Sequence, residues 1–299
     1  RELPRVFTAF RKRVEATGLR RVVPPPLPIP AALPPLPAGL DSGPLPTPVD
    51  LGFAAPPEPA GTPQVQRPLE AMVFRGGERA GRERIEQWMW QADRLRRYKE
   101  TRNGMLAADD SSKLSPWLAH GCLSPRFVAA EVWRYEQERV ANDSTYWLIF
   151  ELLWRDFFRF AAYQAGAALF RRTGPQGTAR RVGRVDWAAF HAWCAGHTGM
   201  PIVDAAMREL VASGFMSNRG RQIVASVLCH DLRVDWRLGA AWFEAQLVDY
   251  DPASNWGNWA YVAGVGHDPR ADRRFDPEKQ ARTYDPDGSF RRAWLESHE

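Results

Sequence analysis

One stretch of the sequence carries groups that can bind phosphate. Residues 110–116 (DSSKLSP) lie between two predicted helices and place the hydroxyls of Ser111, Ser112 and Ser115 beside the ammonium group of Lys113. Hydroxyls, a cation and backbone N–H groups together suit a diphosphate. A serine-rich turn is also a common structural turn, so this pattern alone leaves both interpretations open.

Two carboxylates form a second candidate group. Asp249 and Asp251 lie two residues apart on a predicted turn, where they can accept hydrogen bonds from ring and ribose donors of a cofactor. Arg221 offers a guanidinium group for a buried ion pair with Asp249. The alternative is an ordinary salt bridge at Asp249 and a helix cap at Asp251.

Helices must position these groups. After Gly77 the apolar residues recur with helical spacing, and no alternating run bounded by turn residues predicts a strand. Ser124 with Pro125 favours a helix start, as does Ser144, and the helix after Ser144 is apolar nearly all round, so it should be central and buried. The predicted helices cover residues 78–98, a segment from 125 onward, and residues 145–170, 187–194, 201–212, 218–230 and 238–247.

A proline-rich segment precedes this helical region. Residues 24–68 hold 16 of the 25 prolines and almost no charge, which predicts an extended linker that is either disordered or wrapped over a domain surface. Residues 1–17 are predicted to form one short basic helix. We therefore expect a short helix within residues 1–23, a linker over 24–68 and an all-α domain over 69–299. The missing initiator methionine suggests a further segment upstream.

Composition limits the classes of function. The net charge of +5 and the pI near 9.3 are compatible with a polyanionic partner. Only four of the 40 basic residues are lysines, so an arginine excess of genomic origin explains the charge equally well. No apolar run reaches the ~18 residues that a membrane span needs, and we expect a cytoplasmic protein with no membrane contact. Cys122, Cys194 and Cys229 have no CxxC spacing, so neither a disulfide framework nor a metal site is expected.

Several long motifs of this sequence occur in the same order as in a known protein family. The sequence is similar to the FAD-binding helical domain of the photolyase/cryptochrome family, and residues 98–105 (YKETRNGM) resemble its DASH branch. The resemblance covers essentially everything after the linker. It rests on residues 111–126 (SSKLSPWLAHGCLSPR), 151–157 (ELLWRDF), 198–204 (TGMPIVD), 215–222 (FMSNRGRQ) and 249–259 (DYDPASNWGNW).

This resemblance implies tightly bound FAD as the cofactor. The matching cofactor-binding positions are Tyr98, Ser111, Ser112, Lys113, Leu114, Ser115, Arg221, Asp249, Tyr250, Asp251 and Asn255. Asn255 matches the position that faces flavin N5, where a neutral amide does not repel the anionic reduced flavin as a carboxylate would. Relatives also carry an N-terminal α/β domain that binds an antenna pigment, which is a folate. No parallel-strand pattern for that domain is present here, so antenna binding cannot be assessed from these residues.

The resemblance also implies an electron-transfer chain of tryptophans. Trp259 and Trp236 match two of its members, but Gly183 stands where the outer tryptophan is expected. Trp187 lies about one helical turn further on, so its indole would be displaced from the usual place. Photoreduction of the cofactor by the usual route is therefore expected to be slow.

Ultraviolet-damaged DNA is the partner that the resemblance implies. The positions that match a pocket for a flipped pyrimidine dimer are Glu151, Trp154, Arg155, Asn218, Arg219, Tyr261 and Gln280. Aromatic stacking, hydrogen bonds to exocyclic groups and phosphate contacts are the roles expected there. Tyr261 stands where relatives active on double strands carry tryptophan, which favours single strands. The (6-4) branch needs two histidines where this chain has Asn218 and Gln222, which excludes that chemistry.

Three functions follow. The first is light-driven repair of cyclobutane pyrimidine dimers, mainly in single-stranded DNA, by a monomer that uses reduced FAD. The second is a photosensory flavoprotein that signals without repair, and the third is a flavin-free nucleic-acid-binding helical domain. Asn255 favours the first over the second, and the two intact FAD segments argue against the third.

Overall fold

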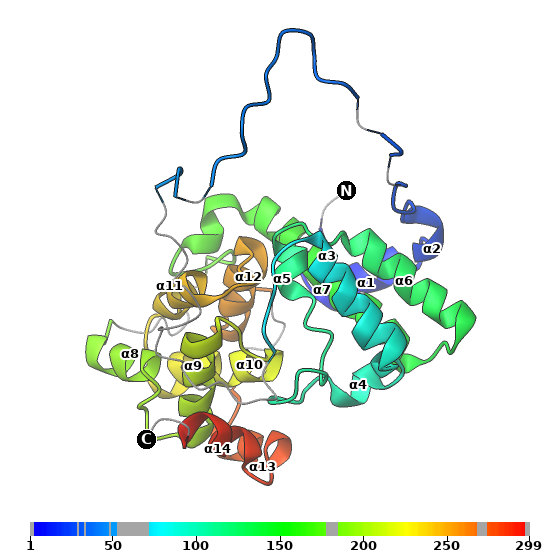
Figure 1. Cartoon of the computed structure of the whole chain (residues 1–299). Helices are drawn as coiled ribbons and strands as arrows, with labels where there is room; N and C mark the ends of the chain where they lie inside the picture. Colours follow the sequence, from blue (N-terminus) through cyan, green and yellow to red (C-terminus); the bar gives the residue numbers. More distant parts are fainter. Residues whose placement is uncertain are drawn as a thin grey trace.

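The computed structural model describes residues 3–28, 30–32, 34–47, 49–52, 72–177, 185–267 and 274–296. Every regular element within these ranges is helical, as Figure 1 shows, so the predicted all-α class is confirmed for the described part of the chain. None of the helices described is both long and apolar enough to cross a membrane.

The central helix is α7 (Asp143–Ala165), which packs against helices from both halves of the chain. Its N-cap is Asn142 rather than the expected Ser144, because the Asn142 side chain accepts hydrogen bonds from the N–H groups of Ser144 and Thr145. The Thr145 side chain in turn accepts a hydrogen bond from the N–H of Asn142, which completes a capping box. The predicted end near residue 170 is wrong, since Gly166 has φ 51° and the chain continues as a 3₁₀ helix, Gly166–Phe170.

Two apolar cores lie beside α7. The first includes residues of α3 (Glu78–Ile85), α5 (Ser115–Ala119), α6 (Pro125–Glu138) and the first half of α7. The second, larger core is formed by the C-terminal helices. Those helices are α8 (Trp187–Cys194), α9 (Pro201–Ser213), α10 (Asn218–Ser226), α11 (Trp236–Gln246), α12 (Pro252–Val262), α13 (Pro277–Tyr284) and α14 (Ser289–Leu295). The predicted helix over 187–194 is confirmed, and the one over 201–212 ends one residue later.

Two predicted helices are interrupted. The single helix over 78–98 is wrong: α3 continues as a π-helix, Glu86–Gln91, and Asp93 then takes a left-handed conformation with φ 53°. Its carboxylate accepts hydrogen bonds from Tyr135 and Arg139, which holds this turn in place. A 3₁₀ turn, Arg94–Arg97, and α4 (Tyr98–Thr101) follow.

The second interruption lies after α10. That helix stops at Ser226 and continues as a π-helix, Val227–Asp231, instead of an α-helix to residue 230. Helix α11 begins two residues before the predicted start, because the side chain of Asp235 accepts a hydrogen bond from the N–H of Arg237 and caps it.

The N-terminal segment forms two helices, α1 (Phe7–Glu15) and α2 (Leu19–Val22), where one was predicted. Gly18, with φ 75°, separates them. Helix α1 packs on α7 through Phe7 and Phe10. The described residues between 24 and 52 contain no helix, and they arch away from the helical body in Figure 1.

Candidate functional site

The loop that joins α4 to α5 carries the predicted phosphate-binding residues. Ser112, Lys113 and Leu114 are buried, Ser111 is partly buried, and Ser115 is exposed at the start of α5. Lys113 has φ 50°, a left-handed conformation that non-glycine residues rarely adopt. Its N–H donates to Ser111 Oγ at 3.4 Å. Three hydroxyls and a cation are therefore held in one tight turn.

A buried arginine that the sequence did not single out fixes this loop. Arg84 of α3 donates to the carbonyl oxygens of Ala108, Ser111 and Ser112 at 2.9, 3.1 and 3.0 Å. Its Nη1 also lies 2.9 Å from the carboxylate of Asp109. Burial lowers the pKa of Arg84, and the pair with Asp109 opposes that shift. The one available signal in the sequence was an arginine on the apolar face of α3, beside Ile85.

Tyr98 connects this loop to α7. The side chain is buried, and the nearby hydroxyls of Ser111 and Ser112 oppose part of the rise in pKa that burial causes. Burial, and secondarily the negative charge of Glu151, raises the pKa of Tyr98 far above its usual value. The phenol therefore stays neutral and can act as a hydrogen-bond donor at any physiological pH.

The predicted pair between Arg221 and Asp249 is confirmed. Arg221 Nη2 lies 2.8 and 3.0 Å from the two carboxylate oxygens of Asp249, and its Nε donates to the carbonyl of Met216. The Asp249 side chain is 2% exposed. A charge-assisted pair at this depth fixes both side chains in one geometry.

Asp251 and Asn255 lie one turn apart at the start of α12. Asp251 Oδ1 accepts from the N–H of Ser254, and its Oδ2 pairs with Arg159 at 2.8 Å. Burial opposes ionisation, but these two partners prevail and lower the pKa of Asp251. Asn255 is buried, and its Nδ2 donates to the carbonyl of Ala240, which fixes the orientation of the amide.

Tyr250 and Arg155 are two further predicted site residues. Burial and a hydrogen bond to Glu244 raise the pKa of Tyr250 to about 12. Arg155 of α7 donates to the carbonyl of Leu118 in α5, the helix that follows the predicted phosphate-binding loop, and burial lowers the pKa of Arg155. The donor set fits a flavin dinucleotide: hydroxyls and cations suit the phosphates, carboxylates suit hydroxyl and imide donors, and Asn255 adds a neutral amide.

The predicted lesion-binding residues begin on the same helix. Glu151 of α7 pairs with Arg102 and accepts a hydrogen bond from Trp147 Nε1 at 3.1 Å. Burial raises the pKa of Glu151, although Arg102 and Trp147 offset part of the shift. Arg102 ends α4 and was not predicted to belong to the site.

Trp154 is partly buried within a stack of aromatic rings. The ring of Phe7 from α1 lies parallel to it, with centroids 3.7 Å apart and an angle of 11° between the planes. Phe158 stacks at 5.4 Å, and Tyr261 meets the indole edge-on at 6.0 Å. One face of the predicted base-stacking residue is therefore covered by α1, a contact that no local pattern in the sequence indicates.

Arg219 and Gln280 come together, whereas Asn218 stays exposed at the start of α10. Arg219 donates to Asn103 Oδ1 at 3.0 Å and to Gln280 Oε1 at 3.4 Å, and its guanidinium lies 4.2 Å from the ring centroid of Tyr284. Burial lowers the pKa of Arg219. Its Nε has no hydrogen-bond partner, so the side chain retains a buried donor.

Trp259 and Trp236 are both buried, and each contacts a different set of aromatic side chains. Trp236 meets Trp256 edge-on at 5.7 Å. Trp259 meets Trp193 at 6.0 Å, Trp193 stacks on Phe190 at 6.1 Å, and Phe190 meets Trp187 at 6.0 Å. Trp187 is 55% exposed, so this series of aromatic contacts (Trp259, Trp193, Phe190, Trp187) leads from the core to the surface. Gly183, where the outer tryptophan was expected, lies outside the described residues.

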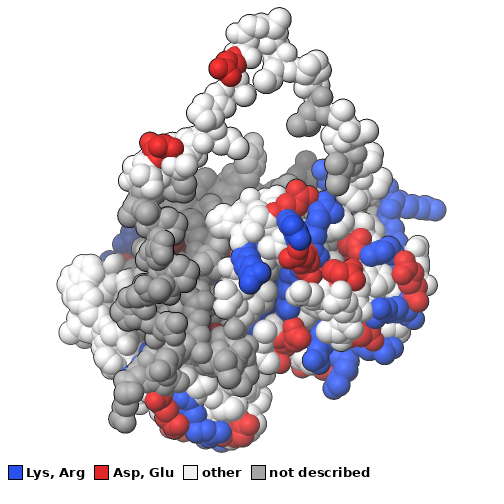
Figure 2. Space-filling view, in the orientation of Figure 1, with Lys and Arg blue, Asp and Glu red and all other residues white. Residues whose placement is uncertain are grey.

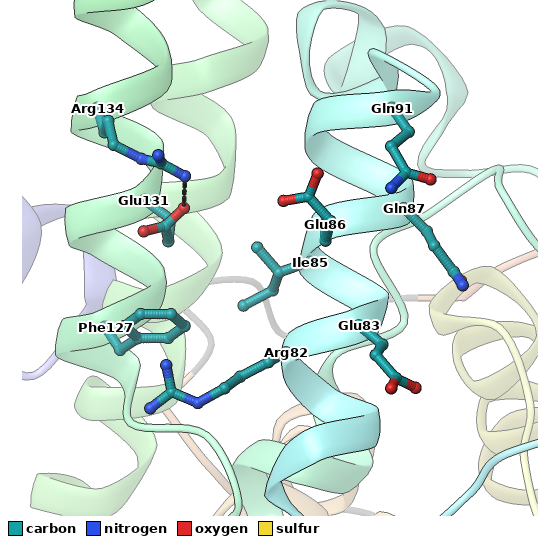
Figure 3. A pocket seen from close by; sticks show the side chains of 9 residues that line it. All are labelled: Arg82, Glu83, Ile85, Glu86, Gln87, Gln91, Phe127, Glu131 and Arg134. Carbon is teal, nitrogen blue, oxygen red and sulfur yellow. Dashed lines mark hydrogen bonds and ion pairs between the residues drawn. The ribbon is translucent and has the colours of Figure 1, made fainter. Parts of the chain in front are cut away.

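A surface pocket of about 580 Å³ lies between α3 and α6. Figure 3 shows its lining, with Arg82 over the ring of Phe127 and Arg134 bonded to Glu131. None of the predicted site residues lines it. Figure 2 shows acidic and basic side chains interspersed over this face, so it offers no uniformly basic surface. The described residues contain no cluster that could hold a metal ion.

Comparisons with known proteins find relatives along nearly the whole chain. The family model "FAD binding domain of DNA photolyase" matches residues 147–299. Cryptochrome DASH of Gloeobacter violaceus is 53% identical over 98% of this chain and 56% of its own length. The solved structure of a Synechocystis cryptochrome is 51% identical with a TM-score of 0.88, covering 99% of this chain and 58% of that one.

A third match is an archaeal photolyase from Sulfolobus tokodaii, solved with two FAD molecules. It is 33% identical with a TM-score of 0.60, covering 78% of this chain and 49% of that one. This chain thus spans about half the length of the relatives it matches.

Proposed function

Because this chain belongs to the photolyase/cryptochrome family through its FAD-binding domain, we propose that it repairs cyclobutane pyrimidine dimers in DNA, mainly in single strands. Reduced FAD, excited by light, supplies the electron that opens the dimer. The protein's own residues bind the cofactor, receive the flipped lesion and keep both in one arrangement. The flavin-free alternative is set aside, because the chain belongs to an FAD-binding family.

One observation carries the proposal: the predicted cofactor-binding residues (the cofactor group) and the predicted lesion-binding residues (the lesion group) are joined through α4 and the residues that follow it. Tyr98 begins α4, interacts with the serines of the predicted phosphate-binding loop, and has its pKa raised by burial and by the charge of Glu151. Glu151 pairs with Arg102, and the next residue along the chain, Asn103, accepts a hydrogen bond from Arg219 at 3.0 Å. A base held by Glu151 and Arg219 would therefore lie next to a cofactor held at Tyr98, as direct electron transfer requires.

Glu151 has a defined role in this arrangement. Its partners Arg102 and Trp147 hold the carboxylate in place, and a carboxylate accepts hydrogen bonds from exocyclic N–H groups of bases. Trp154 and Tyr261 meet at 6.0 Å and supply aromatic surface for stacking. Flipping a base out of a duplex costs a few kcal/mol that a single strand does not require. The smaller ring of Tyr261 therefore favours single-stranded DNA.

The test is a repair assay with matched single- and double-stranded oligonucleotides that carry one dimer. The chain, loaded with FAD and chemically reduced, should restore the absorbance of intact pyrimidines under blue light and not in the dark, and faster on the single strand. Glu151→Gln should slow repair and leave bound FAD unchanged. A chain that binds FAD, is reduced and repairs neither substrate would refute the repair proposal and favour the photosensory alternative.

A further inference from the structure

A buried carboxyl group of α9, that of Glu209, takes no part in the contacts described above. Ser213 Oγ donates to the carbonyl of Glu209 and bonds with the backbone of Phe215, which places Glu209 close to that aromatic residue. Glu209 of α9 is 6% exposed, and its Oε2 atom has no hydrogen-bond partner. Burying an unpaired carboxylate is costly unless a cation balances it or a proton neutralises it. The state of Glu209 therefore depends on the charges around it.

Two cations act on Glu209, and both belong to the cofactor group. They are Lys113 of the phosphate-binding loop and Arg221 of α10, the charged groups that affect Glu209 among the described residues. Lys113 Nζ lies 5.6 Å and Arg221 Cζ 5.2 Å from the ring centroid of Phe215, so the two cations meet at one aromatic side chain. Arg221 is already paired with Asp249. Lys113 is therefore the cation whose charge Glu209 can balance.

We propose that Glu209 is a positioning residue that makes FAD retention depend on pH. When its carboxyl is neutral, the charge of Lys113 is left to balance the anionic diphosphate beside Ser111–Ser115. When it ionises, Glu209 neutralises Lys113 and adds a negative charge close to the phosphates. The proposal rests on Ser111–Ser115 as the diphosphate-binding loop.

The direction of the effect follows from the environment of the carboxyl. Burial raises the pKa of Glu209 to about 8, and the charges of Lys113 and Arg221 offset only part of that rise. Burial also lowers the pKa of Lys113, which the carboxylates of Glu209 and Asp110 oppose. A bound diphosphate repels a second negative charge, so FAD raises the pKa of Glu209 further and a proton is taken up on binding. FAD affinity therefore falls as the pH rises above about 8, by at most about tenfold per pH unit for one proton.

Stability of the FAD-free chain provides an independent measurement. The pKa of Glu209 is about 8 in the folded chain, against 4.5 for an ordinary glutamate. The folded state thus holds a proton that the unfolded state has lost, and its contribution to stability is present at low pH and is lost as the pH rises between these two values. Glu209→Gln, which stays neutral with nearly the same shape, should remove that part of the pH dependence.

The experiment measures FAD affinity by the fluorescence of released flavin from about pH 7 to about pH 9.5, with wild type, Glu209→Gln and Lys113→Met. Wild type should lose about tenfold in affinity over the upper part of that range, as one proton allows. Glu209→Gln should keep its neutral-pH affinity throughout. Lys113→Met should bind FAD more weakly at every pH and show a flatter profile. Glu136→Gln on α6, whose carboxylate pairs with Arg20, is the matched control and should keep the wild-type profile.

A pH profile of Glu209→Gln that equals that of wild type overturns the proposal. If Glu209→Gln does not fold, a Lys113→Met profile as steep as that of wild type overturns it instead. A chain that repairs dimers while its FAD affinity is constant over this range contradicts the role of Glu209 alone. A chain whose FAD affinity changes as expected but which repairs no dimer contradicts the proposed repair alone.

Discussion

Replacing Arg221 with alanine tests the centre of the cofactor site. Arg221 Nη2 lies 2.8 and 3.0 Å from the two carboxylate oxygens of Asp249, whose side chain is 2% exposed. Removing one partner of a buried pair costs about 3–5 kcal/mol, because the other charge is left without compensation. The Arg221 side chain is itself 26% exposed, so water can enter part of the vacated space. We therefore expect a loss near the lower limit, about 3 kcal/mol of folding free energy.

Urea unfolding of the FAD-free chain measures this loss, and the amount of flavin retained after gel filtration measures its effect on the site. Arg208→Ala is the control, since Arg208 of α9 makes one long hydrogen bond, 3.4 Å, to the carbonyl of Leu295. It should cost about 0.5–1.5 kcal/mol, the range of an ordinary hydrogen bond, and retain FAD. Asp249→Asn combined with Arg221→Ala should recover part of the loss, because the stranded charge is gone. Equal losses for Arg221→Ala and Arg208→Ala would refute the reasoning.

Three further outcomes are expected. Arg84→Ala should weaken FAD binding about tenfold, since it leaves buried loop carbonyls unpaired, whereas Arg79→Ala, an exposed residue paired with Glu83, should not; equal affinities would remove Arg84 from the site. Binding to irradiated single strands should weaken steeply with salt, and Trp154→Ala should cost ~1–3 kcal/mol of affinity; an unchanged dissociation constant would make Trp154 a core residue only. Trp187→Phe should slow the photoreduction of bound FAD by an external thiol and leave repair by the chemically reduced chain unchanged; an unaltered rate of photoreduction would exclude electron transfer through the aromatic series that ends at Trp187.

Helical periodicity predicted the fold class because it is a local property of the sequence, and it located α8 and α9 closely. It failed where the backbone changes from an α-helix to a π-helix without a change in the spacing of apolar residues. Trp88 continues the buried face of α3 formed by Gly81, Arg84 and Ile85, so nothing local distinguishes the π-helix that contains it from an α-helix. The end of that helix depends on Asp93, whose left-handed turn is held by Tyr135 and Arg139 of a later segment.

The pair of Arg221 with Asp249 was predictable because the resemblance named both positions. Arg84 was not, since three of its four partners are backbone carbonyls, which leave no residue-type signal in a sequence. Phe7 was missed for a related reason. Its contact with Trp154 joins the start of the chain to the central helix, and an apolar residue near a terminus does not indicate which ring it will cover.

Helix α7 joins the site residues that lie before residue 147 to those that lie after it. Contacts that α7 makes with earlier segments of the chain therefore affect the lesion group. The family model begins at residue 147 and so contains the lesion group, Arg221, Asp249 and Asn255, but neither the phosphate-binding loop nor α1. Three side chains of α7 bridge the two parts: Glu151 reaches Arg102, Trp154 reaches Phe7, and Arg155 reaches the carbonyl of Leu118. Because these residues follow one another on the same helix, a shift of α7 that follows loss of α1 would move all three together. Phe7→Ala should therefore weaken binding of damaged DNA, because it removes the ring stacked on Trp154. Phe10→Ala is the control: Phe10 also packs on Phe157 of α7, so it tests the loss of α1 packing without the loss of that stack. Equal losses of affinity in the two variants would show that the stack on Trp154 has no separate role.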